Sequence, residues 1–285
     1  MIWFLTAALA ADPLPLPQVC DAYLTDAAKR PLHALDELVR AGRALDPAEE
    51  RAIGDDLHQQ ISQVDYPGLV DRDRKQLRYL KKVLKLVLKG IDEPRFAYRI
   101  HYVDDPTVNA FAIPGGHVYV YRGLLEAWVE NEAQLAVVIG HEVGHIELRH
   151  PSALLEYLNS FPALGTDLGF IAVAFTRSLF SSAQELDSDS FGMRAAHYAG
   201  YDVREGISLW EAQINLSSNR NDGRQNRLFD LLGELGNIVA SHPDARARTC
   251  FNMEHYNALQ AEWPVSRAYV GTRKYRTRRV LGPRW

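Results

Sequence analysis

The chain has 285 residues, of which 47% are hydrophobic and 24% are charged. This composition is typical of globular proteins, and the length is sufficient for one large domain or two small ones. The formal net charge of −4 gives no reason to expect a nucleic acid partner.

The first residues resemble an export signal. Residues 1–10 are apolar and end in Ala8-Leu9-Ala10, a small-x-small sequence of the kind that signal peptidase cuts, although they lack the basic residues with which most signal peptides begin. We therefore expect residues 1–17 to be a signal peptide with a Pro-rich leader, and the mature chain to be periplasmic or secreted. The alternative is a buried or disordered N-terminus.

Two cysteines, Cys20 and Cys250, lie near opposite ends of the expected mature chain. In an oxidising compartment they can form one disulfide that ties the termini together. The alternative is two independent buried thiols, and the choice depends on whether the chain is exported.

Residues 21–93 are predicted to be helical. Asp46-Pro47-Ala48-Glu49-Glu50 has the pattern of a helix start, with an Asp N-cap, proline at the first position and acids in the first turn. Residues 71–91 carry an amphipathic stripe of leucine and valine opposite a basic face. That face is either solvated, over a core stripe, or lies on an acidic membrane surface.

Three strands are predicted after Pro94, in residues 96–103, 108–113 and 117–121. Pro114-Gly115-Gly116 forms the turn between the last two, so a hairpin precedes the next helix directly. A short helix is expected to begin at Gly123, and Asn131 is expected to be the N-cap of the long apolar helix that follows.

That helix contains His141-Glu142-Val143-Gly144-His145, the H-E-x-x-H pattern. Residues four apart lie on the same face of a helix, so His141 and His145 can present two imidazoles to one zinc ion. Glu142 lies on the adjacent flank, where it can take a proton from a water molecule at the open coordination position. Gly140 and Gly144 are poor helix formers, and they allow another segment or a substrate to come close.

A zinc peptidase must hold its substrate extended across the metal, and a sheet edge does so by accepting the peptide as another strand. The candidate edge consists of Asn109, Ala110, Phe111 and Ala112. The alternative is an ordinary hairpin with no role in substrate binding.

These motifs, together with Pro114-Gly115-Gly116 and His150, resemble the zinc metallopeptidase family of HtpX and the CAAX prenyl protease type 1, which belongs to the gluzincin clan. The resemblance covers about residues 97–260. From the residues alone, Glu185, Asp187 and Asp189 are equally eligible as the third zinc ligand, since each can present a carboxylate from a later helix. The resemblance implies that Glu185 is the ligand and that Asp189 orients a ligating histidine.

Ser241-His242-Pro243 and Arg248 also match this family. The resemblance implies that His242 and Arg248 face the zinc, where they either stabilise the oxyanion of the transition state or occupy the metal at rest. His150 is matched as well, and we expect a structural role for it. Other histidines, among them His58, His101 and His197, are expected to be structural or exposed.

Residues 163–181 are apolar, and in some members of that family the region spans the membrane. Here Asp167 and Arg177 interrupt it, which leaves a run far shorter than the roughly 20 residues that a spanning helix needs. We expect a helix that covers the cleft, or plain core. The basic tail, residues 265–285, is either an additional β-hairpin, a surface that touches anionic lipid or nucleic acid, or simply solvated.

The sequence therefore predicts a mostly helical α+β metallopeptidase with one domain at residues 18–264, made of a helical part (21–93) and a zincin core (96–260). One zinc ion is expected per chain, and the expected activity is that of a metalloendopeptidase acting on unfolded or misassembled proteins of the cell envelope. The alternative function is a chaperone-like or latent protein whose zinc is structural or plugged by His242. A third is a protein that binds membranes or nucleic acid through the basic tail.

Overall fold

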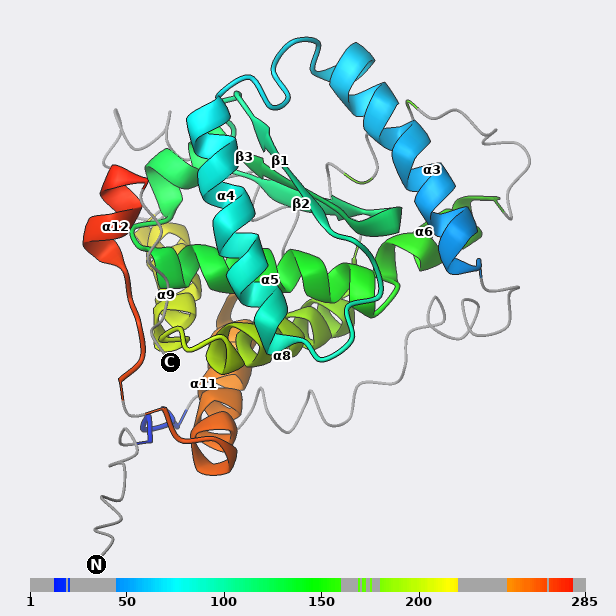
Figure 1. Cartoon of the computed structure of the whole chain (residues 1–285). Coiled ribbons are helices and arrows are strands. Elements are labelled where there is room, and N and C mark those ends of the chain that lie inside the picture. The colour runs from blue at the N-terminus through cyan, green and yellow to red at the C-terminus, as the bar shows by residue number, and fades with distance from the viewer. Residues whose placement is uncertain are drawn as a thin grey trace, which may run out of the picture.

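The computed structural model describes residues 13–18, 20, 45–159, 169, 171–172, 175, 180–219, 245–265 and 267–278. Helices surround a small three-stranded sheet, which confirms the predicted mostly helical α+β class (Figure 1). The predictions for residues 1–12, 21–44, 241–243 and most of 163–179 lie outside this part of the chain. Among the described helices, none is both long and apolar enough to cross a membrane.

The helices that follow Asp46 and Asn131 begin where the sequence predicts. Asp46 caps the helix that begins at Pro47, because its Oδ1 accepts the backbone N–H groups of Ala48 and Glu49 at 2.8 and 2.9 Å. Asn131 caps the motif helix through the N–H of Gln134 at 2.9 Å. The expected helix at Gly123 is a single π-helical turn, Leu124–Trp128. The described helices are α3 (Pro47–Gln60), α4 (Arg74–Val87), α5 (Glu132–Glu147), α6 (His150–Asn159), α8 (Ser182–Tyr198), α9 (Arg204–Asn219), α11 (Ala245–Glu262) and α12 (Thr272–Thr277).

The sheet has the strand order β1-β3-β2, with β1 at Arg99–Val103, β2 at Ala110–Ile113 and β3 at His117–Tyr121. Strands β2 and β3 pair antiparallel, which confirms the hairpin, and β1 pairs parallel to β3. The turn requires glycine, because Gly115 and Gly116 have φ values of 78° and 95°.

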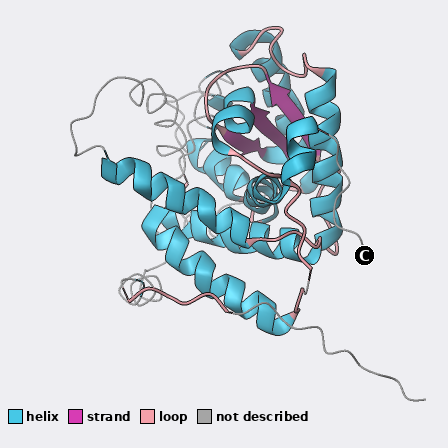
Figure 2. Cartoon of the chain, turned by 90° about the vertical axis from the view of Figure 1, so that its left-hand side faces the viewer, coloured by secondary structure: helices cyan, strands magenta, loops and turns pink. Residues whose placement is uncertain are grey.

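The two faces of the sheet pack against different helices. Side chains alternate along each strand, so Val118 and Val120 point to one face and Tyr119 to the other. The valines join the core cluster that includes α4 and α5. Tyr119 and Phe111 join a second cluster with Leu57 of α3. Figure 2 shows the strands together at one end of the molecule, with long helices below them.

Helices α5 and α8 cross at glycines, and in Figure 1 α8 lies directly beneath α5. A Cβ atom on Gly192 would lie 2.4 Å from the backbone nitrogen of His141, and one on Gly140 would lie 2.7 Å from the carbonyl oxygen of Gly192. A Cβ on Gly144 would lie 3.0 Å from the carbonyl oxygen of Ser188. The glycines of the motif therefore allow the close approach of a second helix, one of the two possibilities that the sequence left open.

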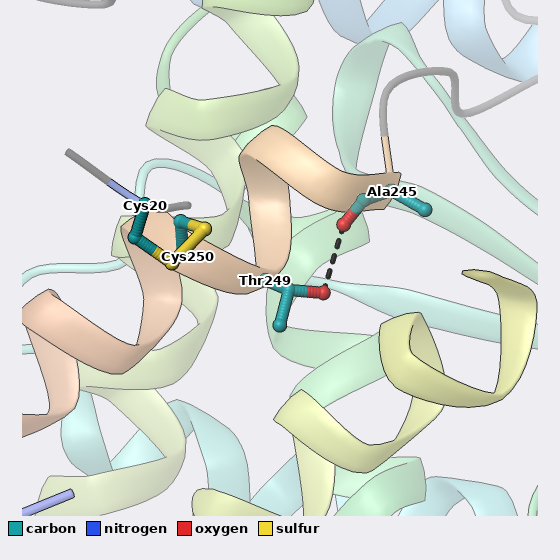
Figure 3. Close-up of a disulfide and its surroundings, with 4 residues drawn as sticks. All are labelled: Cys20, Ala245, Thr249 and Cys250. Carbon is teal, nitrogen blue, oxygen red and sulfur yellow. Dashed lines mark hydrogen bonds between the residues drawn. A yellow bond between two sulfur atoms is a disulfide. The ribbon is translucent and has the colours of Figure 1, made fainter. Parts of the chain in front are cut away.

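The ends of the described chain are tied to this core. Cys20 and Cys250 form a disulfide between the N-terminal segment and α11, with Cα atoms 5.2 Å apart (Figure 3). The backbone of Leu14 exchanges two hydrogen bonds with the side chain of Asn257 on the same helix, at 2.7 and 2.9 Å. Of the two alternatives for the cysteines, the structure therefore has the disulfide.

The basic tail contains helix α12 at residues for which a β-hairpin was one alternative. Its Tyr275 is buried and donates its hydroxyl to the carbonyl oxygen of Leu125, and the guanidinium of Arg278 lies 4.0 Å from the centre of the Tyr275 ring. Residues up to Arg278 thus pack on the rest of the protein, while the division of the chain into domain and tail stays a prediction.

Candidate metal centre

Three buried side chains from two helices converge at the α5–α8 crossing. The Nε2 atoms of His141 and His145, one helical turn apart on α5, are 3.0 Å from each other. The carboxylate of Glu185 on α8 faces both, with Oε2 3.4 Å from His141 Nε2 and Oε1 3.4 Å from His145 Nε2. Each of the three residues is no more than 4% exposed. Together they form a group with the donor types that hold a metal ion.

The spacing of these atoms suits zinc. Nitrogen and oxygen ligands lie about 2.0–2.2 Å from tetrahedral zinc, which places neighbouring ligand atoms about 3.3 Å apart. The observed edges of 3.0, 3.4 and 3.4 Å agree with that value. Two imidazoles and one carboxylate are also the ligand set of catalytic zinc sites that keep a fourth position for water or substrate.

Asp189, one turn beyond Glu185, fixes the orientation of the first histidine. Its Oδ1 lies 2.8 Å from His141 Nδ1, so the Nε2 atom is left to face the group. Burial opposes protonation of His141, but Asp189 and Glu185 outweigh it and raise the pKa of His141 to about 9. This contact is the imidazole–carboxylate pair that commonly supports a metal ligand.

Arg248 and Asn252 on α11 hold Asp189 in turn. Arg248 donates from Nε and Nη2 to the two oxygens of Asp189 at 2.7 and 2.6 Å, and Asn252 donates to Oδ2 at 3.0 Å. Burial alone would raise the pKa of Asp189, but Arg248 and His141 outweigh it and lower the pKa to about 2. Arg248 also lies 3.1 Å from Glu185 Oε2, so one buried cation supports two carboxylates.

The second histidine has a different environment. His145 Nδ1 lies 2.9 Å from His150 Nδ1, and the ring of Phe180 stacks on the His145 ring with centroids 4.1 Å apart. Burial lowers the pKa of His145 well below its ordinary value, and that of His150 to about 4. Both rings are therefore neutral at pH 7, the form in which histidine binds a metal. The contact with His145 agrees with a supporting role for His150.

The comparison with protein families decides the classification. Residues 74–250, more than half of the chain, match the model of peptidase family M48. The chain belongs to this family. Membership of M48 supports a metalloprotease activity, and metal binding by His141, His145 and Glu185 is consistent with it.

Several metallopeptidases are similar to this M48 chain. It is 29% identical to mitochondrial metalloendopeptidase OMA1 of Arabidopsis thaliana over 54% of its own length and 30% of that protein. It is 28% identical to metalloprotease LoiP of Escherichia coli (47% of this chain, 56% of LoiP) and 25% identical to metalloprotease YcaL of the same organism (72% and 78%). The chain thus spans only 30% of the OMA1 relative. These matches support M48 as a whole, and the HtpX or CAAX protease subgroup stays a prediction.

The structure separates the three acids among which the sequence of this M48 chain could not choose. Glu185 faces both histidines, Asp189 contacts the far side of His141, and Asp187 is exposed on the opposite side of α8. Arg248 is brought to the centre, whereas His242 lies outside the described residues.

The predicted substrate edge lies at one side of the sheet, since β2 is an outer strand in the order β1-β3-β2. Asn109, Ala110, Phe111 and Ala112 are all buried, at most 3% exposed. Their role in binding a substrate stays a prediction.

Sequence reasoning missed Asn252 and the contact of Phe180 with His145. Asn252 has a signal in the sequence, because it lies four residues after Arg248 and so on the same face of one helix. Phe180 has none, because its stacking on His145 joins segments that are far apart in the chain.

Proposed function

We propose that this M48 protein is a zinc-dependent metalloendopeptidase that hydrolyses peptide bonds in protein or peptide substrates. The observation that carries the proposal is the convergence of His141, His145 and Glu185, whose ligand atoms have the spacing of a three-ligand zinc site. Glu142 follows the first ligand directly in the sequence and is 1% exposed.

His141, His145 and Glu185 would hold the zinc. When bound, zinc supplies a Lewis acid that polarises the scissile carbonyl and makes water a nucleophile at neutral pH. Glu142 acts as the general base, which accepts a proton from the attacking water and then delivers it to the leaving amine. Its low exposure keeps this carboxylate away from bulk water, which strengthens its interaction with a proton donor.

Asp189 and Arg248 act as positioning residues in this scheme. Asp189 keeps the Nδ1 proton of His141 directed at itself, and Arg248 keeps Asp189 ionised. The guanidinium of Arg248 is directed at Asp189 and Glu185, which favours this role over the oxyanion contact that the family resemblance implies. Stabilisation of the oxyanion by His242 is part of the proposal without a structural observation of its own.

The substrate is proposed to lie extended along Asn109, Ala110, Phe111 and Ala112. Support comes from the outer position of β2 in the sheet and from the packing of β2 on the zinc helix α5. A peptide that joins a sheet edge is held by backbone hydrogen bonds, so this mode suits substrates of varied sequence in an unfolded state.

We further propose that the protein is periplasmic or secreted, with peripheral membrane contact at most, and degrades damaged or misassembled proteins of the cell envelope. The disulfide between Cys20 and Cys250 supports an oxidising compartment, because such bonds are rare in proteins that are kept reduced.

The test compares cleavage of casein by the wild-type protein and by Glu142→Gln, with zinc measured on both. We expect both to bind zinc and only the wild type to cut, with the variant at least 100-fold slower, as is usual when a general base is lost. Glu130→Gln removes an exposed carboxylate just before α5 and should leave cleavage unchanged. Removal of the metal with a chelator should stop cleavage, and added zinc should restore it.

If neither protein bound zinc, the assignment of the metal site would be wrong. If both bound zinc and neither cut any unfolded protein, the site would be latent or structural.

A further inference from the structure

A second group of histidines lies on the sheet face that packs against α3. His58 is on α3, His101 on β1 and His117 on β3, and ligand atoms from the three lie within 4.8 Å of one another. His101 pairs with Tyr119 in the sheet register, and His117 is two residues before Tyr119, so both histidines point to the same face as Tyr119. That face belongs to the cluster that contains Leu57 of α3.

Two of these histidines face each other. His101 Nε2 lies 3.0 Å from His117 Nδ1, and the two rings are nearly parallel, at 14°. The outer nitrogens each meet a carboxylate: His101 Nδ1 lies 3.1 Å from Asp71 Oδ2, and His117 Nε2 lies 3.1 Å from Asp55 Oδ1. The result is a chain of four groups, carboxylate–imidazole–imidazole–carboxylate.

If both imidazoles are neutral, this row of four side chains has too few protons to place one between every pair of neighbours. A neutral imidazole carries one N–H, and each carboxylate accepts one, so two neutral rings use both of their protons on Asp71 and Asp55. Two nitrogen lone pairs then face each other across 3.0 Å. Such an arrangement is repulsive unless a third proton is shared between the two nitrogens or a metal ion binds both lone pairs.

His58 on α3 is the third member of the group. Its ring stacks on that of His101 with centroids 4.2 Å apart, and its Nδ1 lies 2.8 Å from the hydroxyl of Tyr119. His58 thereby brings a third imidazole next to the two facing rings, and its ligand atom lies within 4.8 Å of theirs.

We propose that His58, His101 and His117 bind a second transition metal ion of the zinc type. Neutral imidazoles select such ions over magnesium or calcium, which prefer oxygen. The carboxylates on the outer nitrogens of His101 and His117 are the usual partners of metal-bound histidine. Asp55 and Asp71 also place negative charge beside the group, and Asp55 shares its charge with Arg99 at 2.7 Å.

This ion would join α3 to β1 and β3, on the opposite side of the sheet from α5. It is therefore distinct from the proposed catalytic zinc, and its role is to hold α3 against the sheet. An ion that binds only the folded protein stabilises it by linkage, so its removal should lower the melting temperature without removing the catalytic metal.

The experiment counts zinc on the full chain. The protein is saturated with Zn²⁺, passed over a weak chelating resin, and analysed by metal mass spectrometry. The wild type should retain two ions per chain, one for each histidine group, and His117→Gln should retain one. His197→Gln is the matched control and should retain both, because His197 belongs to neither histidine group and its Nε2 faces the carbonyl oxygen of Trp263.

A His145→Gln background isolates the second site. The His145→Gln protein should retain one ion, and Zn²⁺ should still raise its melting temperature. Adding His117→Gln should remove both the retained ion and the rise in melting temperature. One ion on the wild type would overturn the proposal. Two ions on both the wild type and His117→Gln would place the second ion elsewhere. A count of one ion on the wild type would overturn the proposal even if a variant did not fold.

Discussion

Asp189→Asn removes one negative charge from the most densely bonded carboxylate of the metal centre. In the wild type, Oδ1 accepts from His141 and from Arg248 Nη2, and Oδ2 accepts from Arg248 Nε and from Asn252. An asparagine side chain has one acceptor oxygen, so its amide N–H₂ group must take the place of either Oδ1 or Oδ2 and then face two hydrogen-bond donors. Whichever way the amide turns, two hydrogen bonds are lost.

The magnitude follows from these contacts. Hydrogen bonds to charged groups contribute about 1.5–3 kcal/mol each, so the loss of two gives about 3–6 kcal/mol. Breaking a buried ion pair by removal of one partner costs about 3–5 kcal/mol, a similar figure, since Arg248 is only 4% exposed. We therefore expect the free energy of unfolding to fall by about 3–5 kcal/mol, a large part of the total stability of a domain. Zinc affinity should fall about 10- to 100-fold, because His141 loses its fixed orientation.

The assay is urea unfolding of the metal-free proteins, followed by zinc titration against a competing chelator. Asp56→Asn is the control, because it makes the same change at an exposed helical position, on α3, and should alter neither quantity by more than about 0.5 kcal/mol. An Asp189→Asn protein as stable as the wild type and equal to it in zinc affinity would refute the proposed role of Asp189.

Two further predictions concern the helix crossing and the disulfide. Gly192→Ala places a Cβ 2.4 Å from the backbone nitrogen of His141, so the free energy of unfolding in urea should fall by about 1–3 kcal/mol. The loss should be larger than for Gly144→Ala, whose closest contact would be 3.0 Å. Equal losses would show that the two helices can move apart at little cost. Cys250→Ser opens a loop of 230 residues, for which chain entropy predicts a loss of about 5 kcal/mol and experience with native disulfides about 2–5. The unfolding midpoint should then no longer respond to reductant, and a wild type that is equally indifferent would contradict the disulfide.

The sequence predicts the helix that carries His141 and His145 well because the information is local. Helical periodicity alone places His141 and His145 on one face, and the N-cap at Asn131 follows from residue chemistry. The choice among Glu185, Asp187 and Asp189 is not local. It depends on how α8 crosses α5 at Gly192, and the sequence of one helix does not determine its rotation about a neighbour.

The second histidine group shows the same limit more clearly. His58, His101 and His117 come from three elements, and each alone is an unremarkable residue that the sequence assigns to a structural or exposed position. Their proximity follows from the parallel register of β1 and β3 and from the packing of α3. Parallel strands are not joined by a short turn, so no local sequence pattern predicts the register of β1 and β3.

The link between Cys20 and Cys250 closes a covalent ring that contains every side chain of the metal centre. A peptidase at high concentration can cut its own chain, and any cut between these two cysteines leaves both pieces attached. A nicked molecule would therefore migrate as a single band in electrophoresis without reductant and separate into fragments only after reduction. Reduction before electrophoresis is thus needed to judge whether a preparation of this protein is intact.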